Sequence, residues 1–519
     1  MNIYWNAERR SRWTAYLFFI AVSVLYVIFL FPEPEYPGLN KDDGSWFLVL
    51  GRNVAQHWRY TMDTMVVGDW KWHATWPPAF PLYLACVVAV FGSSWVALKL
   101  AMALTGIALL FVLWRYWKPS HAGIAAVILV GLNPYFFLYS HHTMTEVPYM
   151  LMVAVTLLSL ELVQRWPGAA LAGLLGSLAF LTRGYAVTLL PAGAVYLLAT
   201  RSGSLRERSK LCLSFALPMV IAMALWAIYS NSILLSGEAD GFGKLYGNGT
   251  NILASALRSL AEHIRALYWH NARYAGFLMV PLFSWAQVSG SDVLLGLSVL
   301  LAATAAVGWA RSLSRDRRSA DFWFPLAVGL VLTARVPAAR YWLPLLPFLL
   351  YYTFSALMAM GNRWLPLRPV ALGIAGALAI SAAVGIIWHL SEPSRLRFFS
   401  SYGGETSDLV LWINDHLPAD AVIITESPAD IYGATGRRAF PLAQATGNAA
   451  VPPGVAGELK VYLLCPLSGE VVAHYKSSYG DCTKLLALGR LDLIWHGDEI
   501  GFYRYTRQTD GPRSAGTRR

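Results

Sequence analysis

Charged residues and cysteines are scarce in this chain, and several common catalytic signatures are missing. Only 14% of the 519 residues are Asp, Glu, Lys or Arg, and four are Cys. The sequence has no glycine-rich loop to cradle a phosphate, no Cys/His metal cluster, no nucleophile elbow and no repeat of fixed period. These absences argue against a nucleotide-driven pump.

Hydrophobic residues, by contrast, make up 56% of the chain. They gather between residues 13 and 390 in about eleven apolar stretches long enough to enter or cross a bilayer. Lys and Arg, which give a net charge of +11, concentrate in short loops rather than in one basic stripe. This positive-inside distribution excludes a nucleic-acid partner. It predicts a multi-pass protein of the cytoplasmic (inner) membrane with a cytoplasmic N-terminus.

Residues 1–395 are therefore predicted to form a polytopic α-helical domain of about 11 transmembrane helices. Its two long outer loops are residues 32–93 and 236–291. Within the first loop, Pro77–Phe91 is short and opens with two prolines, so we expect an interfacial or re-entrant helix there.

The composition changes near Ser400 from apolar to mixed. Residues 396–507 combine a helix-like segment, 407–416, with strand-like runs, which predicts a small extracytoplasmic (periplasmic) α/β domain. The strand-like runs are Ala421–Thr425, Lys460–Leu464, Asp492–Trp495 and Gly501–Tyr505. Cys465 and Cys482 share this domain, where an oxidising compartment would permit a disulfide. We expect the tail, residues 508–519, to be disordered.

An acidic pair, Asp42-Asp43, stands in the first outer loop just before the segment Trp46–Gly51, which has the pattern of an amphipathic interfacial helix. Two adjacent carboxylates suit general-base activation of an acceptor hydroxyl or amine. The structural alternative is a solvated helix start with Asp as its N-cap.

A second acidic candidate is Glu146, which opens an apolar helix after the outer loop that carries His141 and His142. An ionisable group at the end of a membrane helix indicates a functional site. The alternative is capping, because Thr143 and Glu146 have the capping-box spacing. The two histidines could hold a phosphate, shuttle a proton or simply be exposed, and they lack the i, i+4 spacing of metal ligands.

Three arginines lie on the predicted outer side, against the positive-inside trend: Arg183, Arg335 and Arg340. Guanidinium groups clamp phosphate oxygens in a bidentate manner. Salt bridges to acidic loop residues are the structural alternative. With the outer carboxylates, these arginines predict an amphipathic substrate, with a phosphate at the headgroup plane and a tail in the bilayer.

Over residues 10–360 the chain resembles the GT-C glycosyltransferases, in the bacterial branch related to protein O-mannosyltransferases and the lipid A aminoarabinose transferase. The resemblance rests on Asp42-Asp43 three residues before Trp46, on the motifs that surround Glu146 and Arg183, and on two further motifs. These two are Trp76-Pro77-Pro78 with Pro81-Leu82-Tyr83, and Arg340-Tyr341-Trp342-Leu343-Pro344-Leu345-Leu346-Pro347.

The resemblance implies inverting transfer of a sugar from a polyprenyl-phosphate carrier to a lipid, glycan or protein acceptor. It makes Asp42 or Asp43 the base and gives Glu146 the role of positioning the acceptor. If a divalent cation such as Mg²⁺ or Mn²⁺ takes part, these three carboxylates would hold it. Arg183 and Arg340 would bind the carrier phosphate.

Relatives often carry a basic residue or His where this chain has Trp76, so Lys71 or His73 would substitute there. Two other functions fit parts of the pattern: a lipid or glycolipid transporter, and a catalytically inactive GT-C-like scaffold. Transporters place ionisable residues near the midplane of the bilayer, whereas the candidates here gather at one surface. An enzyme is therefore the favoured interpretation.

Overall fold

A computed structural model describes 15 segments of the chain, and its residues cluster into two compact units. The described segments are residues 17–28, 43–64, 72–92, 94–117, 120–236, 274–276, 278–280, 292–332, 339–363, 368–391, 412–425, 428–441, 461–466, 490–496 and 500–506. The first unit comprises Met1–Pro32, His73–Tyr83 and Val96–Leu396, and the second Glu33–Trp72, Leu84–Trp95 and Arg397–Arg519. Asp42, Lys71, Arg335, Cys482 and the tail 508–519 lie outside the described residues.

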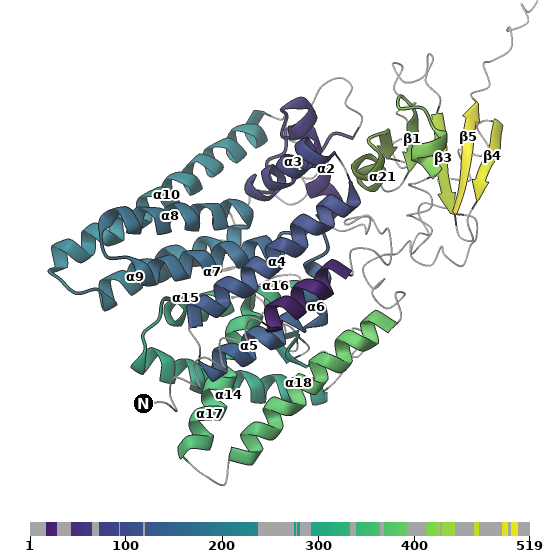
Figure 1. Cartoon of the computed structure of the whole chain (residues 1–519). Coiled ribbons are helices and arrows are strands. Elements are labelled where there is room, and N and C mark those ends of the chain that lie inside the picture. The colour runs from purple at the N-terminus through teal and green to yellow at the C-terminus, as the bar shows by residue number, and fades with distance from the viewer. Residues whose placement is uncertain are drawn as a thin grey trace, which may run out of the picture. The chain divides into compact units, whose positions relative to one another are not determined.

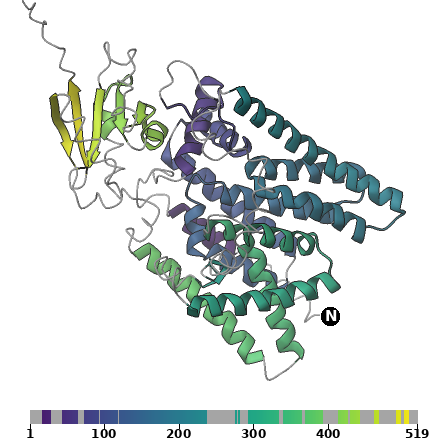
Figure 2. The ribbon, with the colours of Figure 1, turned by 180° about the vertical axis from the view of Figure 1, so that it is seen from behind.

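The first unit is a bundle of helices (Figures 1 and 2). Its first described helix is Leu17–Ile28. The others are α4 (Trp95–Trp117), α5 (His121–Gly131), α6 (Pro134–Tyr139), α7 (Glu146–Leu162), α8 (Trp166–Thr182), η1 (Gly184–Thr188), α9 (Leu189–Thr200), α10 (Leu205–Ser236), α14 (Asp292–Arg315), α15 (Ser319–Leu332), α16 (Ala339–Trp342), η3 (Leu343–Leu345), α17 (Leu346–Arg363) and α18 (Arg368–Ser391). Helix α3 (Ala79–Phe91) contributes residues to both units.

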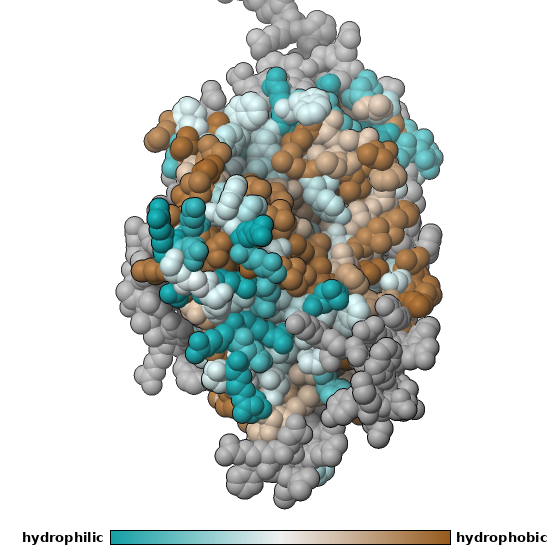
Figure 3. All heavy atoms as spheres, turned by 60° about the vertical axis from the view of Figure 1, so that its left-hand side comes forward, coloured by the Kyte–Doolittle hydropathy of each residue, from teal (hydrophilic) through white to brown (hydrophobic). Residues whose placement is uncertain are grey.

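Apolar side chains on the outside of the bundle mark a membrane protein. By length and composition, four described helices can cross a bilayer: Val96–Trp117, Leu205–Ser236, Gly296–Arg315 and Ala339–Met360. Large side chains such as Leu213, Leu217 and Leu225 on α10 are exposed, as expected for a helix that faces lipid. Figure 3 shows broad hydrophobic areas on either side of a hydrophilic patch. The count of about eleven spans stays a prediction.

Local sequence signals explain where several helices begin. Ser204 and Glu207 form a capping box at the start of α10. The Ser204 N–H donates to Glu207 Oε2 (2.9 Å), and the Glu207 N–H donates to Ser204 Oγ (3.3 Å). Asn133 caps α6 by accepting from the N–H groups of Tyr135 and Phe136, and Pro134 occupies the first turn.

Small residues let α8 approach α10 closely. A Cβ atom on Gly173 would overlap the carbonyl of Phe215, and one on Gly176 would lie 2.8 Å from the sulfur of Met219. Membrane helices associate through such close backbone contacts, because lipid leaves no hydrophobic driving force between them.

A buried polar network joins the end of α7 to the start of α15. Glu161 Oε1 accepts from the N–H of Ser319 (2.9 Å), and the Tyr116 hydroxyl lies 3.0 Å from Ser319 Oγ. Beside it, Asp321 accepts from the hydroxyl of Tyr352 (2.7 Å) and from the N–H of Arg318 (2.7 Å). These carboxylates have several donors each, as buried polar groups require.

The second unit contains a five-stranded sheet in the order β2-β1-β3-β5-β4. Strand β1 pairs in parallel with β2 and β3, and β5 pairs antiparallel with β3 and β4. The strands are β1 (Val422–Thr425), β2 (Arg438–Pro441), β3 (Val461–Pro466), β4 (Arg490–His496) and β5 (Ile500–Thr506). Four of them overlap the runs expected from the sequence, and β2 was not predicted.

Two helices, α2 (Asp43–His57) and α21 (Pro428–Thr435), contribute to the described core of the second unit together with the helical residues 412–416, which supply Ile413. Val49 of α2 is fully buried in a cluster with Ile423, Ile431 and Tyr432, and Trp46 packs against the same cluster. The helix after the acidic pair therefore shares its core with residues that follow position 411 in the chain.

We expect Gly173→Ala to lower the stability of the protein by about 1–3 kcal/mol, because the added methyl group meets backbone on α10. Thermal unfolding of the detergent-solubilised protein measures this. Gly168→Ala on the same helix is the matched control, since its Cβ would meet only Val163 Cα at 3.8 Å. An equal loss in both variants would contradict the close packing of α8 on α10.

Candidate functional site

Glu146 and Arg183 are brought together by the antiparallel pairing of α7 and α8. Only three residues separate the end of α7 from the start of α8, and the two helices pack along each other. The first residue of α7 therefore lies at the same end as the last residue of α8. Arg183 follows α8 in an extended conformation (φ −156°, ψ 126°), which ends the helix before η1 begins.

The two side chains form a buried ion pair. Arg183 Nη1 lies 2.6 Å from Glu146 Oε1, and the two side chains are only 14% and 1% exposed. Arg183 Nη1 also donates to Thr145 Oγ1 (3.0 Å). Glu146 Oε2 is buried and has no hydrogen-bond partner among the described residues. Salt bridging, which the sequence left open for the arginines, thus occurs at Arg183.

A second arginine shares the neighbourhood of Arg183. The Cζ atoms of Arg183 and Arg340 lie 5.3 Å and 5.4 Å from the ring centroid of Tyr341, and Arg183 Cζ lies 5.5 Å from that of Tyr185. Burial opposes the charge of Arg183, but the Glu146 carboxylate raises the pKa of Arg183 above its ordinary value even with Arg340 nearby. Arg183 therefore stays cationic, and two guanidinium groups flank one aromatic ring.

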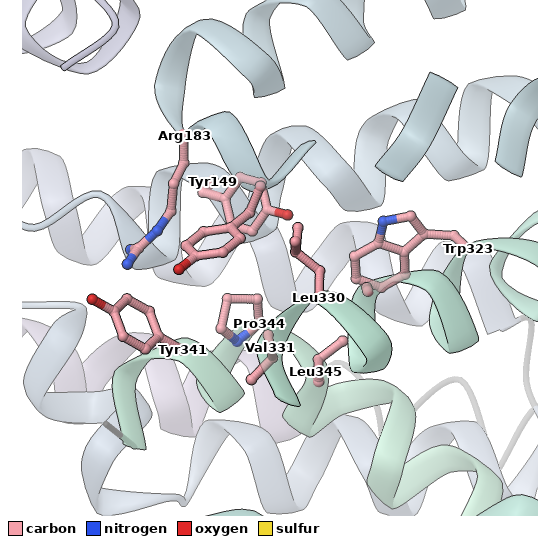
Figure 4. Close-up of a pocket in the computed structure, with 10 residues that line it drawn as sticks. Tyr149, Arg183, Trp323, Leu330, Val331, Tyr341, Pro344 and Leu345 are labelled. Carbon is pink, nitrogen blue, oxygen red and sulfur yellow. The ribbon is translucent and has the colours of Figure 1, made fainter. Parts of the chain in front are cut away.

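Arg183 lines a pocket that is mainly apolar. Figure 4 shows Arg183 and Tyr341 at one end of it and Trp323 at the other. The lining residues come from α7, the α8–η1 junction, α15, α16 and η3: Tyr149, Arg183, Tyr185, Trp323, Ala327, Leu330, Val331, Tyr341, Pro344 and Leu345. The pocket thus combines one cation with an apolar lining.

The structure limits what each of the two predicted loop histidines can do. His141 is buried, with Nδ1 2.8 Å from the carbonyl oxygen of Phe137 and Nε2 3.1 Å from that of Tyr26. Burial, with the charge of Lys99, lowers the pKa of His142 to about 3. Because His142 is then neutral at pH 7, it could bind phosphate only as a hydrogen-bond donor and not as a cation.

His73, a further predicted phosphate ligand, is buried within its own loop. Its Nε2 accepts from the N–H of Trp76 (2.9 Å), and its carbonyl oxygen accepts from the hydroxyl of Tyr229 (3.2 Å). The next carbonyl, that of Ala74, accepts from Ser230 (2.6 Å). These contacts fasten the loop to α10, and a phosphate-binding role for His73 stays a prediction.

Asp43, the described member of the acidic pair, is the first residue of α2 in the second unit. No group of three His, Cys, Asp or Glu side chains that could hold a metal occurs in the described part of the chain. Asp42 lies outside that part, so a divalent cation held by Asp42, Asp43 and Glu146 also stays a prediction.

The aromatic residues of the pocket and one buried lysine were missed by the sequence analysis. Tyr185 and Tyr341 follow Arg183 and Arg340 closely, and Tyr149 is three positions after Glu146 on one helix face, so spacing could have identified them. Lys99 is 8% exposed on α4, and a lone cation in an apolar run was the available signal.

Sequence comparison finds a known family over part of the chain. Residues 75–227 match the family described as dolichyl-phosphate-mannose-protein mannosyltransferase. The match covers less than a third of the chain and includes Glu146 and Arg183, but neither the acidic pair nor Arg340. The chain matches no curated protein in sequence.

Solved structures show the same fold over nearly the whole chain. ArnT from Cupriavidus metallidurans matches both in the apo state and bound to undecaprenyl phosphate, each with a TM-score of 0.56 at 13% identity. The apo match covers 95% of this chain and 98% of ArnT. The oligosaccharyltransferase of Archaeoglobus fulgidus matches with a TM-score of 0.52 at 12% identity, covering 94% of this chain and 73% of its own.

We expect Glu146→Gln to destabilise the protein by about 3 kcal/mol, because it leaves a buried arginine without its counter-charge. The double variant Glu146→Gln/Arg183→Met should recover part of this loss, since no uncompensated charge remains. Thermal unfolding of these two variants, of the single variant Arg183→Met and of the parent protein completes the cycle. Strictly additive losses would show that the two side chains do not interact.

Proposed function

Because the chain has the fold of the GT-C glycosyltransferases, we propose that it transfers a sugar from a polyprenyl-phosphate carrier to an acceptor at the membrane surface. The fold and the partial family match agree with the enzyme class that the sequence resemblance predicted. The observation that carries the proposal is the placement of Arg183 and Arg340 over Tyr341, at the polar end of the apolar pocket.

The pocket suits the two halves of such a carrier. Two guanidinium groups can neutralise and hold a phosphate in bidentate fashion. Beyond them, Leu330, Val331 and Trp323 offer an apolar surface for the first units of a polyprenyl chain. The solved ArnT that binds undecaprenyl phosphate has the same fold, which supports a lipid-phosphate carrier for this chain.

The proposed chemistry is a direct displacement. An oxygen or nitrogen of the acceptor attacks the anomeric carbon of the sugar while the bond from that carbon to the phosphate oxygen breaks. The acceptor proton passes to a carboxylate, and the carrier phosphate leaves with the bonding electron pair. Arg183 and Arg340 stabilise the charge that develops on this phosphate, so no separate general acid is required. Attack from the face opposite the leaving group inverts the anomeric configuration, as in inverting glycoside hydrolysis.

Carboxylates have two roles in this scheme. Asp42 or Asp43 is the proposed base, because two adjacent carboxylates in the first outer loop suit general-base activation of an acceptor. Glu146 holds Arg183 with one oxygen and is the residue proposed to position the acceptor. On the predicted topology the reaction takes place on the outer face of the cytoplasmic membrane.

We expect the double variant Asp42→Asn/Asp43→Asn to lose transfer by a factor of about 100 or more while it still binds the carrier, because only the base is removed. A panel of labelled polyprenyl-phosphate sugars with membrane extract as acceptor measures transfer by the purified protein. Binding of the unlabelled carrier is measured in parallel. Loss of carrier binding together with transfer would make the pair structural. Absence of transfer by the parent protein with every donor, despite carrier binding, would favour lipid transport or an inactive scaffold.

We expect Arg340→Gln to raise the KM for the donor by a factor of about 10–100, since a charge-assisted contact to the phosphate is lost. Arg318→Gln is the matched control: Arg318 Cζ lies 5.7 Å from the ring centroid of Tyr351, among the residues that join α14 to α15. Its donor KM should equal that of the parent protein. A similar rise in both variants would show that the effect does not come from a phosphate site.

A further inference from the structure

Helix α2, whose first residue is Asp43, is fastened to the C-terminal residues of the second unit by its middle turn. Arg52 Nη1 donates to the carbonyl oxygens of Tyr432 (2.9 Å) and Gly433 (3.0 Å) in α21. Its Cζ lies 5.6 Å from the centroid of the Tyr432 ring. A cation at the last turn of a helix is favoured by the carbonyl dipoles there, so this contact is directional as well as close.

The lack of a side chain at Gly436 leaves room for the Arg52 guanidinium. This glycine follows α21 with φ +73°, and its N–H bonds to the carbonyl oxygen of Tyr432. A Cβ atom at this position would overlap the Arg52 guanidinium. Glycine thus satisfies two demands together, a left-handed backbone that ends α21 and room for an arginine from α2.

The next residue of α2, Asn53, adds a chain of buried hydrogen bonds. The Tyr432 hydroxyl donates to Asn53 Oδ1 (2.6 Å), and Asn53 Nδ2 donates to the carbonyl oxygens of Thr61 (2.8 Å) and Asp63 (3.0 Å). Asn53 is fully buried, so each of these bonds would be costly to lose. These hydrogen bonds of Asn53 fix α2, and the residues that follow α2, against α21.

This packing reaches the first turn of α2. A Cβ atom on Gly433 would lie 3.4 Å from Leu48 Cδ2 and 3.7 Å from the carbonyl oxygen of Ser45. Gly433 is thus in contact range of a residue two positions after Asp43. The backbone of α21 therefore limits where the start of α2 can lie.

We propose that the C-terminal domain is a positioning platform for Asp43, the first residue of α2, with Arg52, Asn53 and Tyr432 as the positioning residues. The proposal rests on the proposed function, in which the pair supplies the base. A base must be held within a fraction of an ångström of its productive position, and residues that lock a supporting helix provide this. The domain's sheet and α21 would therefore set the catalytic rate without contact between these residues and the substrate.

Two arginines of the second unit form a matched pair for the test. Arg52 joins α2 to α21, whereas Arg437 joins segments of the C-terminal domain to each other. Arg437 donates to Asn414 Oδ1 (2.6 Å) and to the carbonyl oxygen of Leu417 (2.8 Å). Lysine at either position keeps the charge and loses the fork of donors. Both variants weaken the unit, but only Arg52→Lys loosens α2.

We expect Arg52→Lys to lower kcat by a factor of about 10–100 with the donor KM unchanged, as for a misplaced catalytic group. Arg437→Lys should keep the kcat of the parent protein. Hydrogen exchange of the amides of residues 43–51 should accelerate in Arg52→Lys relative to Arg437→Lys. Transfer kinetics of the full-length detergent-solubilised variants and exchange followed by mass spectrometry give the two readouts.

Equal kcat values for the two variants would overturn the proposal, whether or not exchange differs. Exchange that is equal in both, with kcat lowered only in Arg52→Lys, would also overturn it, because the loss would then not arise from movement of α2. A parent protein without transfer activity refutes the proposed function separately. In that case the exchange rates still decide whether Arg52 holds α2 in place.

Discussion

A charge buried among apolar helices needs its counter-charge, and the ion pair between Glu146 and Arg183 is where this chain meets that constraint. Because α7 and α8 run antiparallel, one residue begins a helix where the other ends one. The extended backbone at Arg183 then lets its guanidinium face Glu146, Tyr185 and Tyr341 together. The ion pair thus joins the end of α8 to the start of α7. It also places the Arg183 cation near the Tyr341 ring, which Arg340 approaches as well.

The other end of α7 shows what a purely structural carboxylate looks like. Glu161 is 15 positions from Glu146, about 22 Å along the helix. Its Oε1 atom accepts hydrogen bonds from the N–H and hydroxyl groups of Ser319 and from the hydroxyl of Tyr116, and all three donors are neutral. Glu146 instead has one charged partner and one oxygen without a hydrogen bond among the described residues. The same helix therefore carries a carboxylate held by neutral donors at one end and a carboxylate paired with a cation at the other.

Hydropathy and charge placement were enough to predict a helical membrane protein, because lipid forces each spanning segment to satisfy its own backbone. The candidate site was predicted only in part. Glu146, Arg183 and Arg340 were identified because charges stand out in apolar sequence, and the structure brings the three together. Trp323 was not identified, since aromatic residues are common in this chain and no charged residue of the predicted site lies beside it in the sequence to mark it as part of the pocket. Strand β2 escaped because its sequence, Arg-Ala-Phe-Pro, opens with a charge and ends with a proline and so lacks the apolar β-branched run that identified β1.

The pairing of α2 with the C-terminal domain could not be predicted either, because its partners are hundreds of residues apart. Asn53 and Tyr432 are separated by 379 positions, and closing a flexible loop of that length costs about 5 kcal/mol in entropy. The intervening residues are not a flexible loop, however, since most of them fold into the helices of the first unit. A folded connection has already lost most of its conformational freedom, so the contacts of Arg52, Asn53 and Val49 need to offset far less. The membrane unit thus lowers the entropic cost of the second unit merely by being folded. On this reasoning, α2 and the C-terminal sheet can form one structural unit although most of the helical first unit lies between them in the sequence.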